Sequence, residues 1–191
     1  MTIAHPLSSE EQQTLLRLAR LSIEAAVRDE DPPAIKLEDY SPALQEEGAA
    51  FVTLTRSGKL RGCIGAIEAY QPLVQDVCEH AAAAATEDFR FEPVRPEELE
   101  SLEIEISRLT RPVPLAYSSP EELAGKLRPG IDGVVIKEGF RRATFLPQVW
   151  EKLPDTKDFL RNLCQKMGAP GNYWQTHMVE VLVYQVEEFH E

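Results

Sequence analysis

The sequence predicts an α+β protein with a largely antiparallel sheet and packed helices. Three observations predict this class: two hairpin patterns, several amphipathic helical segments and a composition rich in core-forming residues. Of the 191 residues, 43% are aliphatic or aromatic, which is enough for a buried core and argues against disorder. Because hairpins outnumber strand–helix–strand units, an antiparallel sheet fits better than a parallel one.

Four segments carry apolar residues at helical spacing. They cover residues 10–28, 72–86, 119–127 and 155–167. Ser8 and Glu11 form a capping-box pattern at the start of the first. Pro72 suits the first turn of the second, and Gly168 is a natural stop for the last. The polar stretch from residue 31 to about residue 48 is expected to be a long loop.

The strand signals are two hairpins and two further segments. The hairpins pair residues 50–55 with 60–67 and 134–137 with 140–145, and the other strands are 102–107 and 179–186. Clean alternation in 102–107 indicates one buried face. Glu103 and Glu105 are then most simply its solvated side, although paired carboxylates can also serve as acid and base. Residues 87–93 are expected to be an irregular, aromatic-bearing loop.

The net charge of −12 bears on the class of partner. Such a charge repels polyanions, so we expect no general nucleic-acid binding. Six arginines of the middle region could converge into a local cationic patch, or could simply pair with the many glutamates. They are Arg90, Arg95, Arg108, Arg111, Arg141 and Arg142.

Cysteine usage and the lack of long apolar runs predict a cytoplasmic location. Cys63, Cys78 and Cys164 are few, odd in number and far apart, which favours free thiols in a reducing compartment. The longest apolar run, residues 81–85, is far too short to cross a bilayer, so no membrane association is expected. Residues 1–6 lack the features of a signal peptide. The four histidines are scattered, so we expect no metal and no cofactor; they are His5, His80, His177 and His190.

The segment from Leu60 to Gly65, with the sequence LRGCIG, carries the chemistry. If Leu60 and Ile64 point to the core, strand alternation places Arg61 beside Cys63 on the other face. A fixed cation favours the thiolate, which is the nucleophilic form. Glycines on either side of the cysteine let another backbone or a ligand come close. The alternative is that Cys63 is a small buried hydrophobe, as Cys78 and Cys164 are expected to be.

This hexapeptide resembles the signature of the AMMECR family (AMME chromosomal region gene 1 domain), whose prokaryotic members are called AmmeMemoRadiSam system protein A. Residues 87–91 resemble the family's "D-x-R-F" loop, residues 133–135 its "G-V" hairpin arm and residues 143–151 its "TFLPQVW" block. The final valine-rich strand also fits. Phe89 stands where relatives usually carry a small residue or proline.

The resemblance implies one AMMECR-type domain over residues 1–191, with two lobes, one of which can be a smaller insertion, and a cleft between them. It also implies a Memo-like protein and a radical S-adenosylmethionine protein as partners. The candidate site joins distant segments. Cys63 and Arg61 are the catalytic candidates, and Gly62, Gly65, Asp88, Arg90 and Gln148 the substrate-binding ones.

Three functions compete for this site. The first is an enzyme component in which Cys63 is the nucleophile or carrier thiol, although the sequence shows no histidine base beside it. The second is a non-catalytic adaptor that binds a protein, RNA or small ligand in the same cleft. The third is a purely structural hexapeptide whose glycines permit close strand packing.

Overall fold

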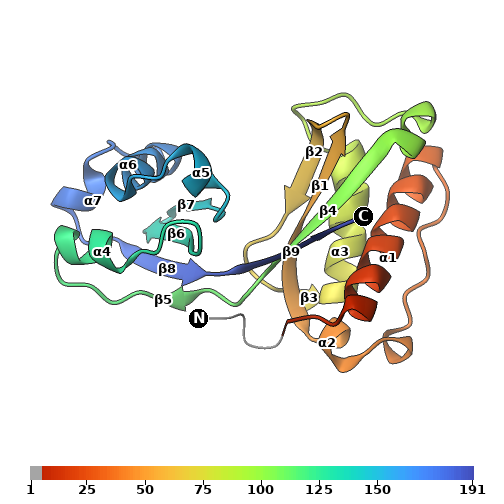
Figure 1. The fold of residues 1–191 in the computed structure, drawn as a ribbon, viewed down its shortest axis with the longest axis horizontal. Helices are drawn as coiled ribbons and strands as arrows, with labels where there is room; N and C mark the ends of the chain where they lie inside the picture. Colours follow the sequence, from red (N-terminus) through yellow and green to blue (C-terminus); the bar gives the residue numbers. More distant parts are fainter. Residues whose placement is uncertain (1–5) are drawn as a thin grey trace. The chain divides into compact units, whose positions relative to one another are not determined.

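The computed structural model describes residues 6–191, which fold into two compact units (Figure 1). Unit 1 runs up to Thr110 and takes in Glu187–Glu191 again at the end of the chain. Unit 2 is the intervening segment Arg111–Val186. The predictions for residues 1–5, including His5, lie outside the described residues. Both units mix helices with antiparallel strands, which confirms the α+β class.

Unit 1 is a sheet with two helices on one face (Figure 1). Its strands lie in the order β2-β1-β4-β9, with β3 added to β1. The strands are β1 (Glu47–Arg56), β2 (Lys59–Gly65), β3 (Gln71–Pro72), β4 (Leu102–Leu109) and β9 (Val186–His190). The helices are α1 (Ser9–Arg28), α2 (Pro42–Gln45) and α3 (Leu73–Thr86), with 3-10 turns η1 (Leu37–Asp39) and η2 (Pro96–Ser101). α1 and α3 cover the sheet.

Burial in unit 1 follows the sequence periodicities. The alternate strand residues Val52, Leu54, Ile104 and Ile106 form one core with apolar residues of α1 and α3. The predicted capping box is present, because the Ser8 side chain accepts from the Glu11 backbone and the Glu11 carboxylate accepts from the Ser8 backbone. The predicted helices 10–28 and 72–86 are confirmed as α1 and α3, to within one residue at each end.

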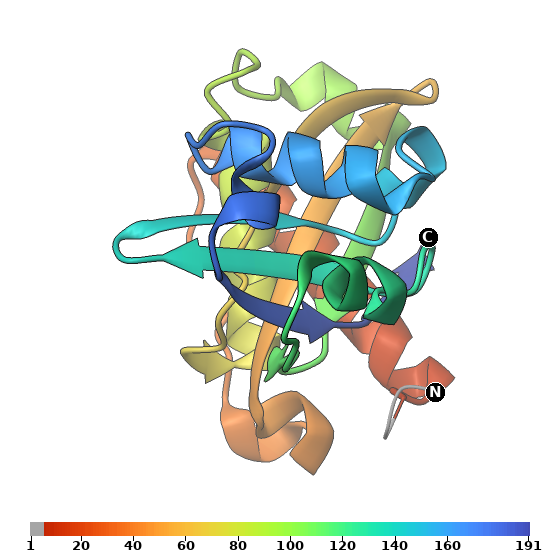
Figure 2. The ribbon, with the colours of Figure 1, turned by 90° about the vertical axis from the view of Figure 1, so that its left-hand side faces the viewer.

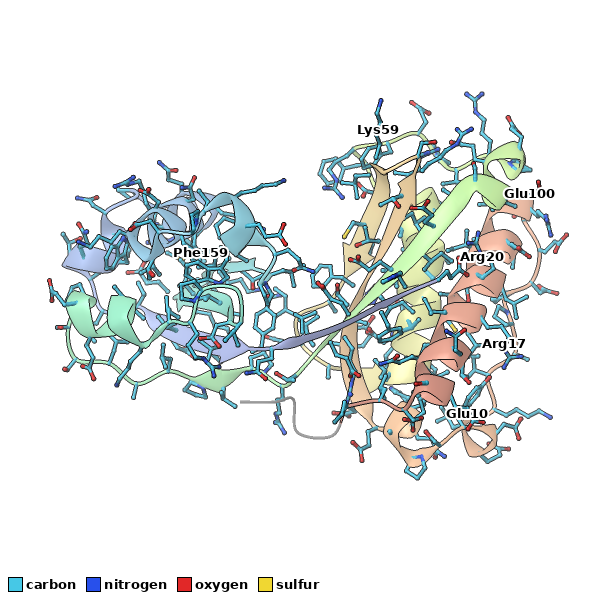
Figure 3. All side chains as sticks on the ribbon, in the orientation of Figure 1. Glu10, Arg17, Arg20, Lys59, Glu100 and Phe159 are labelled. Atoms are coloured by element: carbon cyan, nitrogen blue, oxygen red, sulfur yellow. The ribbon has the colours of Figure 1, made fainter. Side chains whose placement is uncertain are left out.

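Unit 2 has a second sheet in the order β5-β8-β6-β7. Its strands are β5 (Val113–Pro114), β6 (Gly133–Glu138), β7 (Arg141–Phe145) and β8 (Glu180–Tyr184). Its helices are α4 (Pro120–Lys126), α5 (Val149–Lys152), α6 (Thr156–Lys166) and α7 (Tyr173–Thr176), and α4 and α6 share one core with the sheet (Figure 2). Phe159 of α6 lies at the centre of that core, stacked on Trp150 at 3.7 Å between ring centroids (Figure 3). Asp155 caps α6 as predicted.

Two predictions about extended segments are wrong. The stretch 31–48 is not one long loop, since it contains η1 and α2 and the start of β1. The final strand is not single either: β8 belongs to the sheet of unit 2, and β9 belongs to the sheet of unit 1. Local sequence patterns do not identify hydrogen-bond partners far away in the chain, so they could not assign the two strands to different sheets.

Among residues 6–191, no helix has the length and apolar character needed to cross a membrane.

Candidate functional site around Cys63

Cys63 lies on the sheet face of unit 1 that α1 and α3 leave uncovered. Its neighbour Gly62 faces α3, so alternation turns the Cys63 side chain to the opposite face. There Cys63 is paired across the ladder with Thr53 of β1. The Thr53 hydroxyl donates a hydrogen bond to the Cys63 sulfur at 3.3 Å. The thiol is half-buried and free, so it is neither a core hydrophobe nor part of a disulfide.

The loop residues Asp88 and Arg90, called the hook below, bind the backbone of Cys63 at the edge of the sheet. β2 is the outermost strand, and the Cys63 N–H donates to Asp88 Oδ2 at 2.8 Å. The guanidinium of Arg90 donates to the Cys63 carbonyl oxygen at 3.3 Å and to both carboxylate oxygens of Asp88. Asp88 thus replaces the carbonyl acceptor and Arg90 the amide donor that a further strand would offer, and together they cover an otherwise open edge.

Asp88 is held as a carboxylate. The hydrogen bonds from Arg90, followed by those from the Cys63 and Arg90 backbones, keep the pKa of Asp88 far below its ordinary value despite burial. The same contacts raise the pKa of Arg90. The hook is therefore an ion pair over the whole physiological pH range.

The expected position of Arg61 beside Cys63 is wrong. A β-bulge between Leu54 and Thr55 leaves Arg61 unpaired in the ladder, which breaks the alternation on which that expectation depended. The bulge also turns Leu60 outward, opposite Thr55, where it is 43% exposed. Among the described residues, the guanidinium that reaches Cys63 is that of Arg90.

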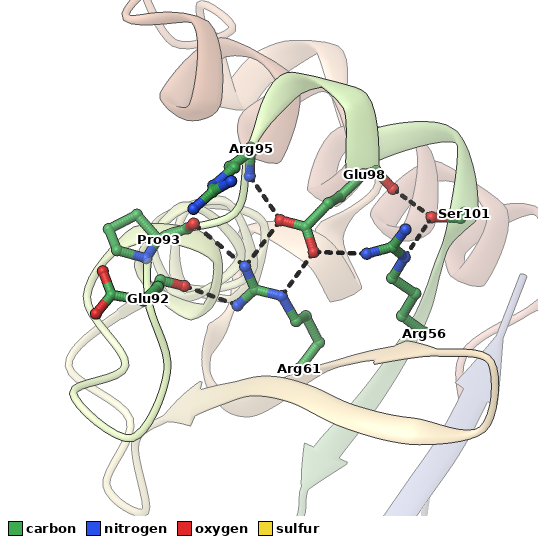
Figure 4. Close-up of polar contacts among 7 residues, drawn as sticks. All are labelled: Arg56, Arg61, Glu92, Pro93, Arg95, Glu98 and Ser101. Atoms are coloured by element: carbon green, nitrogen blue, oxygen red, sulfur yellow. Dashed lines mark hydrogen bonds and ion pairs between the residues drawn. The ribbon is translucent and has the colours of Figure 1, made fainter.

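Arg61 instead ties β2 to the segment that carries the hook (Figure 4). Its Nε and Nη2 donate to the two carboxylate oxygens of Glu98 at 3.0 and 2.9 Å. Its Nη1 and Nη2 donate to the backbone carbonyls of Glu92 and Pro93. Glu98 also accepts from Arg56 and from the Arg95 backbone. Arg61 is therefore a positioning residue for the loop that contacts Cys63.

Glu98 is the central anion of this network. Hydrogen bonds from Arg61, then the Arg95 backbone and the charges of Arg61 and Arg56, lower the pKa of Glu98 to about 2. Glu98 is a buried residue, with 9% of its surface exposed. Neither the sequence spacing nor its polar surroundings singled out Glu98, because its partners lie 37 and 42 residues away.

The glycines of the hexapeptide leave space for neighbouring backbone atoms of the same chain. A Cβ on Gly62 would lie 2.1 Å from the carbonyl oxygen of Ala84 in α3. One on Gly65 would lie 2.4 Å from the Ala50 carbonyl oxygen and 2.5 Å from Phe51. Both approaches are far inside van der Waals contact, so Gly62 allows β2 to pack closely on α3 and Gly65 allows β2 to lie close to β1. A contact with substrate stays a prediction for both.

Thr53 is a site residue that the sequence did not reveal. It lies opposite Cys63 on one side and opposite Glu105 of β4 on the other. Alternation within β1 indicated its face, but only the strand register identifies its neighbours.

The remaining predicted residues lie apart from this cluster. Gln148 belongs to unit 2, where its Oε1 is buried without a hydrogen-bond partner among residues 6–191. A site that joins it to Cys63 therefore stays a prediction. Cys164 is fully buried and Cys78 packs half-buried against the core of unit 1. Burial raises the pKa of both thiols.

Three of the six arginines of the middle region form ion pairs with different acidic residues. Arg90 pairs with Asp88, Arg108 with Glu187 and Arg141 with Glu138.

The two units differ in net charge. Unit 1 has ten Lys and Arg against 24 Asp and Glu, a net charge of −14, whereas unit 2 has ten against eight, a net charge of +2. The site around Cys63 therefore lies in the strongly acidic unit.

Unit 1 also has a groove that is lined by charged side chains. A shallow groove of about 510 Å³ lies between α1 and η2, and Arg20 and Glu100 in its lining are marked in Figure 3. Acidic and basic side chains both line this groove. No three His, Cys, Asp or Glu side chains of residues 6–191 are grouped so that they could hold a metal ion. The chemistry available at Cys63 is that of a thiol with a hydroxyl donor and a nearby cation.

Comparison with known proteins agrees with this fold. The sequence pattern of the AMMECR1 family matches residues 16–189. A protein of Methanothermobacter thermautotrophicus is 39% identical over 188 residues, covering 97% of both chains. Protein MJ0810 of Methanocaldococcus jannaschii is 35% identical, covering 97% of this chain and 92% of its own. The crystal structure of uncharacterized protein PH0010 from Pyrococcus horikoshii superposes with a TM-score of 0.88 at 34% identity, covering 97% of this chain and 93% of that one. The chain belongs to the AMMECR1 family.

Proposed function

We propose that the protein is a cytoplasmic enzyme component in which the Cys63 thiol acts as a nucleophile or carrier thiol. The observation that carries this proposal is the hydrogen bond from the Thr53 hydroxyl to the Cys63 sulfur. A donor aimed at sulfur stabilises the thiolate over the thiol. The family resemblance supplies the expected partners, a Memo-like protein and a radical S-adenosylmethionine protein.

Each neighbouring residue has a role in this proposal. Arg90 places positive charge beside Cys63, where it favours the thiolate and can attract an anionic substrate group. Asp88 fixes both Arg90 and the Cys63 backbone. Arg61 holds the loop that carries them. Gln148 stays a predicted substrate-binding residue, and its buried Oε1, which has no hydrogen-bond partner among residues 6–191, would be less costly with a ligand bound.

Cys63 should be the most reactive of the three thiols, and Thr53 should be the reason. With limiting iodoacetamide at pH 7, mass-spectrometric mapping should find Cys63 labelled before Cys78 and Cys164, whose burial keeps them protonated. Thr53→Val keeps the shape and removes the donor, so labelling of Cys63 should slow about tenfold, the usual effect of a hydrogen bond to a charged group.

Thr55→Val is the matched control. Thr55 lies two residues along the same strand and face but opposite Leu60, so its loss should leave the rate at Cys63 unchanged. Earlier labelling of Cys78 or Cys164 would contradict the proposal, as would equal rates in the Thr53 and Thr55 variants.

The function itself is tested by metabolite profiling after gene deletion. Deletion of this gene should accumulate the same compounds as deletion of either expected partner, because loss of any component blocks a shared pathway. The wild-type gene should restore the profile, and Cys63→Ser and Gln148→Ala should not. A profile unlike those of both partner deletions would refute the shared pathway, and full restoration by Cys63→Ser would refute a thiol reaction.

One observation favours the adaptor function as the alternative. Phe89, between Asp88 and Arg90, has a side chain that is 95% exposed. An exposed aromatic ring beside the site could anchor a protein partner. In that case Cys63→Ser would restore the metabolite profile, and Phe89→Asp would not. RNA is disfavoured as a ligand by the net charge of −14 on unit 1.

A further inference from the structure

Three side chains form a row across the open face of the unit 1 sheet. Cys63 on β2 is opposite Thr53 on β1, and Thr53 is opposite Glu105 on β4. All three are half-buried. Directly opposed residues of an antiparallel pair have Cβ atoms about 5 Å apart. The row therefore places a thiol, a hydroxyl and a carboxylate in sequence.

A second row in the same sheet shows that a glutamate in this position reaches the threonine. Two residues along, Thr55 is opposite Glu103 in the same ladder and on the same face. There the Thr55 hydroxyl donates to the Glu103 carboxylate at 3.1 Å. The Thr53–Glu105 pair has the same two residue types in the same kind of register position, so the Glu105 carboxylate has the reach to accept from the Thr53 hydroxyl.

We propose that Glu105 accepts the proton of Cys63 through the Thr53 hydroxyl when the thiol attacks its substrate. This inference rests on the proposed function of Cys63 and supplies the base that the sequence lacked. In the transfer, the S–H proton moves to the Thr53 oxygen while the Thr53 proton moves to Glu105. The products are a thiolate and a neutral carboxylic acid, and charge and protons balance. Thr53 then donates to sulfur, as it does in the structure.

A purely electrostatic role for Glu105 would have the opposite sign. A carboxylate near sulfur disfavours the thiolate, so its removal alone would increase reactivity. A proton acceptor does the reverse at low pH, where the thiol must lose its proton during attack. Among the described residues of these strands, Glu103 lies on the same face of β4, and Glu188 and His190 are exposed residues of the adjacent strand β9. All three remain present in a Glu105 variant.

The test is the pH–rate profile for acetylation of Cys63 by p-nitrophenyl acetate, from pH 5.5 to 9.5, with Cys63→Ser as the background. At pH 6 the wild type should react at least about tenfold faster than Glu105→Gln and Thr53→Val, a threshold set below the roughly 10²–10⁴-fold that general acid–base catalysis typically contributes. The Glu105→Gln profile should meet that of the wild type at high pH, where the thiol is already ionised. Formate should restore the rate at pH 6 in Glu105→Ala, because it replaces a proton acceptor.

Glu103→Gln is the control that separates this role from general surface charge. It makes the same change in the neighbouring row, where no thiol lies opposite the threonine, and should stay within about twofold of the wild type. A Glu105→Gln rate at pH 6 equal to or above that of the wild type would overturn the inference alone. Wild-type Cys63 that stays inert over the whole pH range would instead refute the proposed function beneath it.

Discussion

Replacing Gly62 by alanine should lower the free energy of unfolding by about 3 kcal/mol, although it adds one methyl group. Its Cβ would lie 2.1 Å from the Ala84 carbonyl oxygen and 3.1 Å from the carbonyl carbon. Both atoms belong to the backbone of α3 and cannot rotate away as a flexible side chain would. Strand β2 must therefore move off the helix, and overpacking of this kind costs up to about 3 kcal/mol. Urea denaturation followed by far-UV circular dichroism measures the change.

The matched control is the same substitution at Gly125. That glycine lies within helix α4, and a Cβ there would meet no atom within 4 Å. Alanine is the better helix former, so Gly125→Ala should stabilise the protein by about 0.5–1 kcal/mol. Equal and small effects at the two sites would show that the contact between Gly62 and Ala84 is not tight in solution.

Replacing Glu98 by alanine should also be strongly destabilising, by about 3 kcal/mol at pH 7. The Arg61 guanidinium, whose side chain is 16% exposed, would lose its counterion. Removing one partner of a largely buried ion pair costs about 3–5 kcal/mol, and partial exposure of Arg56 places the effect at the low end. The Arg95 backbone N–H loses its acceptor as well.

The contribution of Glu98 to the free energy of unfolding should disappear at low pH. Its pKa is about 2 in the folded protein against an ordinary value of 4.5. A lowered folded-state pKa contributes stability that is fully present above pH 4.5 and is lost as the pH falls through 2. The unfolding free energies of wild type and Glu98→Ala should therefore converge between those values, and the wild type should show the steeper pH dependence.

Hydrogen exchange gives a local readout of the same change. The Cys63 amide is bonded to Asp88 in the loop that Arg61 and Glu98 hold, so it should exchange faster in Glu98→Ala. Glu103→Ala, on the exposed face of β4, should change stability by no more than about 0.5 kcal/mol. Unaltered Cys63 exchange in Glu98→Ala would show that the loop is held by other contacts.

Much of the fold is determined locally and was predictable for that reason. The capping box at Ser8, the stop at Gly168 and the turn at Ser57 and Gly58 each depend on a few neighbouring residues. Ser57 and Gly58 have φ values of 52° and 71°, the left-handed values that a tight hairpin turn requires. The alternation in residues 102–107 likewise predicted the strand and its buried face.

The division of the chain into two units could not be predicted from local sequence patterns. Residues 179–186 are predominantly apolar and were predicted as one strand, yet the polypeptide changes sheets at Gln185 between β8 and β9. Which strand a segment joins depends on partners far away in the sequence, and alternation carries no information about them.

The site shows the same limit at the level of single residues. The sequence alone identified Cys63 as the centre, and Asp88 and Arg90 as companions through the family resemblance. Arg61 was assigned to Cys63 because strict alternation was assumed, and one bulged residue sent its guanidinium to Glu98 instead. The sequence already offered Glu105 as a possible acid or base, but only the register of three strands connects Thr53 and Glu105 with Cys63. Local patterns determined which residues were available for chemistry, and tertiary hydrogen bonding decided which of them lie together, because pairing across a sheet joins residues that no local signal connects.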